Sequence, residues 1–195
     1  IKMDVIIDFS GYFIPDNKFT IKEFSVMSLL RGGFSTTPSY VSGVFKSPFN
    51  WNELPEHYKI SYFIESQDFG IAWDQGNLDY DIHLAQLKKL LENATHIYVK
   101  DPKIKYLLET QFRHLYSGCE ISPLYNFGYI HEFVSKTECV YHENPSHHVC
   151  TLDNVKQMTS WFIRSDTANK LPCCVKRKYS EKDLLNSNKH LKVDN

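Results

Sequence analysis

The chain has 195 residues, of which 42% are hydrophobic and 14% are aromatic, and its formal net charge at pH 7 is −1. This length is enough for one domain with a sizeable core. The balanced charge excludes a protein that attracts nucleic acid through bulk positive charge alone. The sequence has no run of about 18 apolar residues, which argues against a membrane-spanning helix.

The cysteines indicate a cellular compartment. The chain has five of them, an odd number, and two, Cys173 and Cys174, are adjacent. Both features suit a reduced compartment better than a framework of disulfides. We therefore expect an intracellular protein, located in the cytoplasm and/or the nucleus.

The first part of the chain predicts three strands. Segment 3–14 (MDVIIDFSGYFI) is rich in β-branched and aromatic residues and ends at a Pro-Asp-Asn turn cluster. As a strand it places Asp4 and Asp8 on one face. Segment 18–30 (KFTIKEFSVMSLL) follows at hairpin distance, and segment 40–49 (YVSGVFKSPF) is a third strand candidate. The order predicts an antiparallel meander.

The second part changes to helical periodicity. Apolar residues recur at helical spacing in 80–94, 101–116 and 151–164, and short strand-like segments lie between them at 96–100 and 119–122. Three antiparallel strands followed by alternating helix and strand predict an α/β fold, with a mixed sheet and helices on its faces.

The domain organisation follows from the same patterns. Residues 1–164 read as one domain, whereas residues 165–195 are polar, weakly basic and without sustained periodicity, which predicts a flexible tail. The aromatic, proline-rich segment 45–59 (FKSPFNWNELPEHYK) is either a lid, a partner surface or an ordinary packed connection.

The segment 139–155 (CVYHENPSHHVCTLDNV) concentrates soft metal ligands. Cys139 and His142 are three residues apart, and Cys150 follows at the start of a predicted helix. Zinc takes four ligands in a tetrahedron and favours thiolate and imidazole. His147, His148 or a carboxylate from elsewhere can supply the fourth. The alternative is a small buried cysteine at a helix start beside solvated histidines.

The order of elements resembles the ribonuclease H-like fold of proofreading-type 3′–5′ exonucleases. Asp8 matches the aspartate of that family's first motif, with Ser10 where the family has glutamate, and Lys105 stands at the aspartate of the second motif. His148 and Asp153 keep the spacing of the third motif. The family's chemistry needs four carboxylates around two metals, and two are missing here. We expect the shared fold without an efficient two-metal nuclease, because a cation at Lys105 would also oppose the metals.

A second resemblance, over residues 4–164, is to the Maelstrom domain, an exonuclease-like fold with a Glu–Cys–His–Cys zinc site. The matching residues are Glu23, Cys139, His142 and Cys150. The resemblance implies a structural Zn²⁺ that joins the last helix to the sheet. In strand 18–30 we also expect Glu23 to share one face with Ile21, opposite Phe24.

The resemblance implies an RNA partner, with single-stranded RNA bound in small-RNA (piRNA) silencing of transposons. Candidate phosphate contacts are Lys100, Lys103, Lys105 and Arg113; the alternative is an ordinary solvated helix face. Two other functions stay open. One is a nuclease, metal-dependent through Asp8, His148 and Asp153 or metal-independent. The other is a protein-interaction module without nucleic-acid activity.

Overall fold

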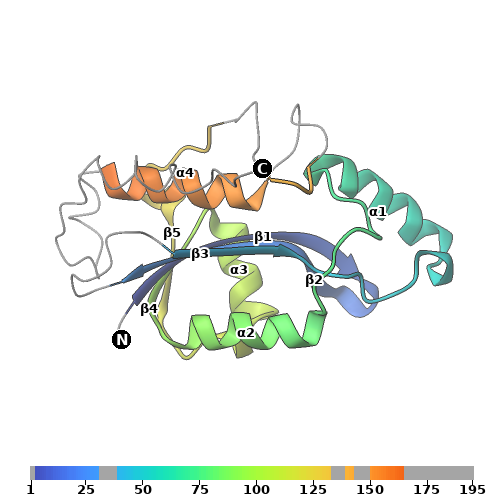
Figure 1. Ribbon diagram of the computed structural model, residues 1–195, viewed down its shortest axis with the longest axis horizontal. Coiled ribbons are helices and arrows are strands. Elements are labelled where there is room, and N and C mark those ends of the chain that lie inside the picture. The colour runs from blue at the N-terminus through green and yellow to red at the C-terminus, as the bar shows by residue number, and fades with distance from the viewer. Residues whose placement is uncertain (1–2, 31–38, 133–138, 143–149, 165–195) are drawn as a thin grey trace, which may run out of the picture.

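The computed structural model describes residues 3–30, 39–132, 139–142 and 150–164. Its centre is a five-stranded mixed sheet of order β3-β2-β1-β4-β5 (Figure 1). The strands are β1 (Met3–Ile14), β2 (Lys18–Leu30), β3 (Ser39–Val44), β4 (Ala94–Val99) and β5 (Glu120–Pro123). The first three strands pair antiparallel, and β4 and β5 add in parallel to β1. This arrangement confirms the predicted α/β class and is consistent with a ribonuclease H-like fold.

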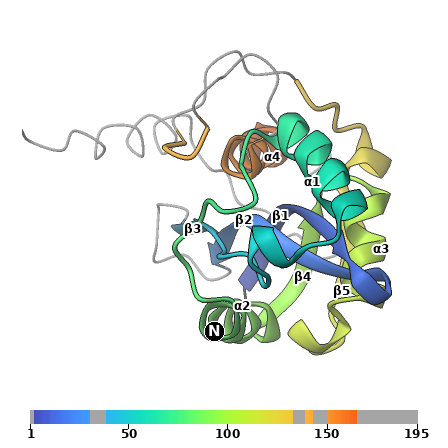
Figure 2. The same cartoon turned by 90° about the vertical axis from the view of Figure 1, so that its right-hand side faces the viewer.

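Four helices cover the two faces of the sheet. They are α1 (Glu56–Phe69), α2 (Tyr80–Glu92), α3 (Pro102–Thr110) and α4 (Thr151–Arg164). In Figures 1 and 2, α4 and α1 lie on one side and α2 lies on the other. No helix in the described part of the chain is long and apolar enough to cross a membrane.

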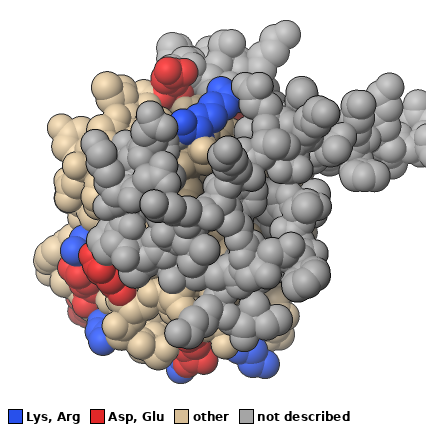
Figure 3. Space-filling model, turned by 90° about the vertical axis from the view of Figure 1, so that its left-hand side faces the viewer, with Lys and Arg blue, Asp and Glu red and all other residues tan. Residues whose placement is uncertain are grey.

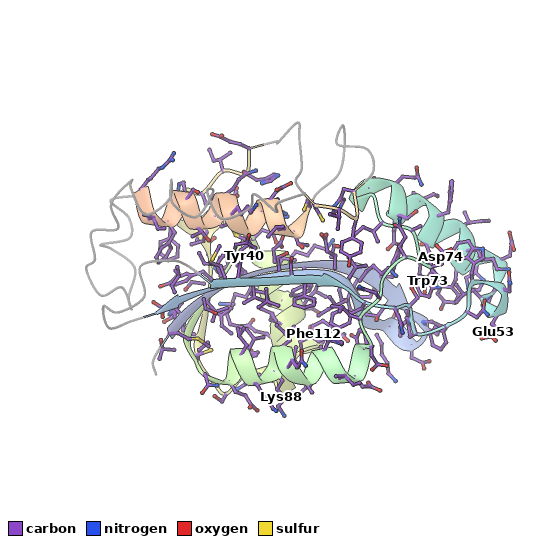
Figure 4. All side chains as sticks on the ribbon, viewed as in Figure 1. Tyr40, Glu53, Trp73, Asp74, Lys88 and Phe112 are labelled. Carbon is purple, nitrogen blue, oxygen red and sulfur yellow. The ribbon has the colours of Figure 1, made fainter. Side chains whose placement is uncertain are left out.

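The helices are attached through separate apolar clusters. Between the sheet and helices α2 and α3 lies the largest, which includes Val5, Ile7 and Phe112 (Figure 4). A second cluster joins Ile6 on β1 to Val155 and other residues of α4. Because side chains alternate along β1, Asp4 and Asp8 share a face with Ile6, as predicted, and this face lies toward α4.

A bulge interrupts the pairing of β1 with β2. Ser10 lies opposite Glu23, but the next residue, Gly11, lies opposite Ile21, so Lys22 is the extra residue. The bulge reverses the alternation, and Ile21 packs in the same apolar cluster as Phe24. The prediction that Ile21 shares a face with Glu23 is therefore wrong. A two-residue period holds only while both strands advance together.

The bounds of the elements agree in part with the sequence. Strands 3–14 and 18–30 and helix 151–164 were predicted with the observed bounds. The third strand ends at Val44, five residues short of the prediction at 49. Helix α1 was not predicted. The proposed tail, 165–195, lies outside the described residues.

Candidate metal centre

Four potential metal ligands meet where α4 begins, beside the sheet. Glu23 comes from β2, Cys139 and His142 come from one turn, and Cys150 directly precedes α4. One ligand atom from each residue lies within 4.8 Å of all the others. The structure thus brings together the four residues that the sequence singled out, here called the metal quartet.

Local backbone contacts hold these side chains in place. The His142 amide donates a hydrogen bond to the Cys139 carbonyl at 3.3 Å, which closes the turn that carries both residues. The Cys150 carbonyl accepts the Asn154 amide at 3.0 Å, so Cys150 occupies the cap position of α4. The Thr151 amide donates to Glu23 Oε2 at 3.2 Å. The first turn of α4 therefore places its positive dipole end against the carboxylate.

The distances suit a small tetrahedral cation. Glu23 Oε1 lies 4.0 Å from Cys139 Sγ and 3.8 Å from Cys150 Sγ. Glu23 Oε2 lies 3.8 Å from His142 Nε2. Bond lengths of about 2.0 to 2.3 Å to a tetrahedral zinc ion separate the ligand atoms by about 3.3 to 3.8 Å. The quartet needs only a small contraction to reach that geometry.

Burial makes a cation favourable at this position. Glu23 is only 2% exposed, and desolvation is the main cause that raises its pKa to about 8, with the nearby Cys150 thiol as a second cause. A hydrogen bond with Cys150 lowers the pKa of the Cys139 thiol. In their charged forms, a thiolate and a carboxylate would repel each other at this buried position. A bound divalent cation would stabilise both.

With all four positions taken by protein ligands, a metal here would have no open site for water. The quartet can therefore hold an ion that links β2, the 139–142 turn and α4, but it offers no place for metal-bound substrate. The donor set is appropriate for such a role, because two thiols and an imidazole are strong ligands for a borderline-soft ion.

Asp8, the residue that matches the nuclease motif, has different neighbours. Asn154 Nδ2 donates to Asp8 Oδ2 at 2.6 Å, and Lys100 Nζ lies 4.0 Å from the same oxygen. Desolvation raises the pKa of Asp8, although Lys100 and Asn154 act in the opposite direction. Among the described residues, the metal quartet is the one group of three or more ligands placed to hold an ion.

Of the other residues matched to the nuclease motifs, Lys105 and Asp153 lie in the described part of the chain. Lys105 forms an ion pair with Glu109 at 3.6 Å, and the cation beside Asp8 is Lys100. The cation found at Asp8 is thus Lys100, which the sequence had not singled out for that role. Asp153 lies on α4, where its neighbour Asn154 makes the contact to Asp8. His148 lies outside the described residues.

The predicted phosphate contacts are dispersed. Lys100 is shared between Asp8 and Asp101, Lys105 pairs with Glu109, and Arg113 lies 4.6 Å from the ring centroid of Tyr116. Lys103 is exposed. On the face shown in Figure 3, basic and acidic side chains lie beside each other and do not gather into a patch of one sign.

Sequence reasoning overlooked two residues that shape this region. Asn154 binds Asp8, and its only signal was its position next to the motif-like Asp153. Lys22 is buried beside Glu23, although a lysine in a strand usually predicts a solvent-facing position.

In comparisons with known proteins, no family model matches the chain, and no curated protein matches it.

Proposed function

We propose that this chain is a zinc-stabilised ribonuclease H-like domain that binds single-stranded RNA and has lost two-metal cleavage. The observation that carries the proposal is the contrast between two sites on the same side of the sheet. The metal quartet has four converging ligands, whereas Asp8 is bound by an amide and faces an ammonium group.

Zinc is the ion that fits the donors best. Thiolate and imidazole ligands favour zinc over magnesium, which takes oxygen ligands in an octahedron. The ligand order, Glu on the second strand, Cys-x2-His before the last helix and Cys at its start, is similar to the Maelstrom domain. By that resemblance the domain would act in small-RNA silencing of transposons.

The neighbours of Asp8 support the loss of two-metal chemistry. Two metal ions about 4 Å apart need several carboxylates around them. At Asp8, Asn154 presents an N–H donor where a metal would need an oxygen, and Lys100 supplies a competing positive charge. Both residues would have to withdraw before a divalent ion could bind Asp8.

A groove along α4 supports contact with single-stranded RNA. It has a volume of about 570 Å³ and is lined by Trp161, by the basic residues Lys156 and Arg164 and by the acidic Glu132, with the buried Tyr129 ring packed edge-on against Trp161. Aromatic rings stack bases without sequence preference, and lysine and arginine neutralise phosphates. We therefore place the RNA contact of this proposal on the α4 groove.

The experiment combines metal analysis with an RNA titration. Mass spectrometry of the purified chain should give one zinc per molecule. A labelled single-stranded RNA should bind with an affinity that falls as salt rises, and Trp161→Ala with Arg164→Ala should weaken it about tenfold or more. Ile82→Ala, at an exposed position of α2, is the control.

Cleavage assays distinguish the alternatives. The proposal expects no RNA cleavage on addition of magnesium or manganese. Metal-dependent cleavage that disappears in Asp8→Ala would show that the nuclease is intact and would reject the degenerate site. An RNA affinity that does not change with salt, or that is the same in the groove variants as in the control, would reject the RNA contact.

A further inference from the structure

A second pocket lies beside α1. It has a volume of about 710 Å³ and is formed by the segment that follows β3, by one side of α1 and by the chain after α1. Five aromatic residues line it: Phe49, Trp51, Tyr62, Phe63 and Trp73. Figure 4 labels Trp73 and the pocket residue Asp74 between α1 and the end of the sheet. We call this the α1 pocket.

Its aromatic residues divide into a fixed floor and an accessible rim. Trp73 and Tyr62 stack in parallel with ring centroids 4.5 Å apart, and both are buried. The Trp73 indole also donates to the Phe49 carbonyl at 3.0 Å. By contrast, 62% of Phe63 and 43% of Phe49 are exposed. The pocket therefore offers ring surface to a ligand without any need to unfold.

The buried Lys22 ammonium binds backbone carbonyls of the segments that form the pocket. Lys22 Nζ donates to the carbonyls of Phe45 at 3.0 Å and Trp73 at 2.6 Å, to Gln75, and to the Ser47 hydroxyl at 3.0 Å. These partners belong to the two chain segments on either side of α1. A pocket whose walls are joined in this way is preorganised for binding.

The charge around the pocket favours a cationic ligand. The lining itself holds one aspartate and one lysine, and the surrounding segment 46–74 has five acidic residues and two lysines in all, a net charge of −3. Asp74 lines the pocket and is exposed, and Lys46 is the one lysine among the lining residues. Aromatic faces attract weakly hydrated cations, and carboxylates add to that attraction. The same charge disfavours an RNA backbone.

The surface beside the pocket favours a peptide over a small free cation. Helix α1 exposes three large apolar residues, Ile60, Phe63 and Ile64, each more than half accessible. Neighbouring exposed apolar side chains mark surfaces that other proteins cover. A peptide can lie across this helix face while one of its side chains enters the pocket.

We propose that the α1 pocket binds the side chain of an arginine or a methylated lysine from a basic peptide segment of a partner protein. The cation stacks on the rim rings of Phe49 and Phe63, and Asp74 balances its charge. The site is separate from the metal quartet and from the α4 groove. It gives the domain a protein partner whether or not it binds RNA.

The test uses the full chain and four fluorescein-labelled nonapeptides in which glycine alternates with one other residue. That residue is arginine, lysine, trimethyllysine or citrulline, and the last keeps the shape of arginine without its charge. Fluorescence polarisation should show binding to the arginine or the trimethyllysine peptide, at least about tenfold tighter than to citrulline. The stronger of the two identifies the natural side chain. Equal binding of citrulline would overturn the proposal.

Matched variants locate the binding. Phe63→Ala and Asp74→Asn should each weaken the cationic peptide about five- to tenfold. The controls are Tyr106→Ala on α3, where Tyr106 is 63% exposed, and Asp81→Asn on α2. Each should change the affinity for the cationic peptide less than twofold. Thermal unfolding confirms that each variant is folded. Equal losses in Phe63→Ala and Tyr106→Ala would overturn the site.

Lys46→Glu separates a peptide from RNA as the occupant. The substitution removes the lysine that lines the pocket. It should therefore raise the affinity for a cationic peptide two- to fivefold, an effect on the order of a surface ion pair. If the variant instead weakens single-stranded RNA, and RNA displaces the peptide, the pocket is a nucleic-acid site and the proposal fails. Loss of RNA binding in α4 groove variants has no bearing on this result.

Discussion

Lys22 and Glu23 are consecutive, both 2% exposed, and their charged groups are in two different sites. The Lys22 ammonium binds backbone carbonyls of the α1 pocket, and the Glu23 carboxylate lies in the metal quartet. Because both faces of the sheet are covered, two neighbouring residues of β2 can both be buried. One short piece of β2 therefore joins a candidate metal centre to a candidate peptide pocket.

The first prediction concerns the zinc. Cys150→Ser should lose the metal and lower the melting temperature substantially, because the free energy of binding a structural metal is part of the free energy of folding. Cys119→Ser is the matched control, since Cys119 is a free cysteine packed on the other side of the sheet, and it should keep one zinc. Metal content by mass spectrometry and calorimetric unfolding check both. Full zinc occupancy in Cys150→Ser would contradict the quartet.

The second prediction concerns the pH dependence of the metal-free protein. Burial raises the Glu23 pKa from 4.5 to about 8, so the folded chain holds this proton more tightly than the unfolded chain. The stabilisation is complete below about pH 4.5 and is lost as pH rises through about 8. Glu23→Gln has no proton to lose and should show a smaller fall in stability between pH 5 and 8.

Urea unfolding of chelator-treated protein at pH 5 and pH 8 measures this effect. Glu53→Gln is the control, because Glu53 is exposed and the substitution should leave the pH slope unchanged. If the wild-type chain and Glu23→Gln lose the same free energy over this range, Glu23 does not titrate as its burial requires.

The third prediction concerns the buried ammonium. Lys22→Met keeps most of the length of the side chain but removes the ammonium donor from the carbonyls of Phe45 and Gln75. We expect a loss of about 2 to 4 kcal/mol in the free energy of unfolding. Lys88→Met on the outer side of α2 (Figure 4) removes only an exposed ion pair with Glu92 and should cost less than about 1 kcal/mol. Chemical denaturation of both variants provides the comparison.

The fourth prediction concerns the bulge. A Cβ at Gly11 would collide with the Thr20 carbonyl oxygen on the neighbouring strand, so Gly11→Ala should destabilise the fold by about 2 kcal/mol or more. At Gly43, the Cβ would meet the flexible end of the Leu78 side chain. Gly43→Ala should therefore cost less. Equal midpoints for the two variants in a urea titration would show that the bulge can adjust.

The sequence alone determined the strongly patterned elements. The predicted bounds of β1, β2 and α4 match the observed ones. Their β-branched or amphipathic patterns are long, and clear signals mark where each one starts and stops. Helix α1 has no such pattern. Its buried side carries Tyr62 and Ser66, while Ile60, Phe63 and Ile64 are exposed, so its apolar residues do not follow the face that packs inward.

The candidate site was also partly determined by the sequence. Cys139 and His142 are close along the chain, so one turn is enough to present both, and their residue types indicated a metal. Glu23 is 116 residues from Cys139, and a resemblance suggested it. Only the folded sheet shows that the two side chains meet.

Tertiary structure alone decided three features. Lys22, the extra residue of the bulge, has its ammonium bound by the carbonyls of Phe45 and Trp73. Asn154 and Lys100 came to Asp8 from α4 and from the end of β4. The α1 pocket formed from segments on both sides of a helix. Each depends on contacts between residues far apart in sequence, and such contacts leave no local pattern to recognise.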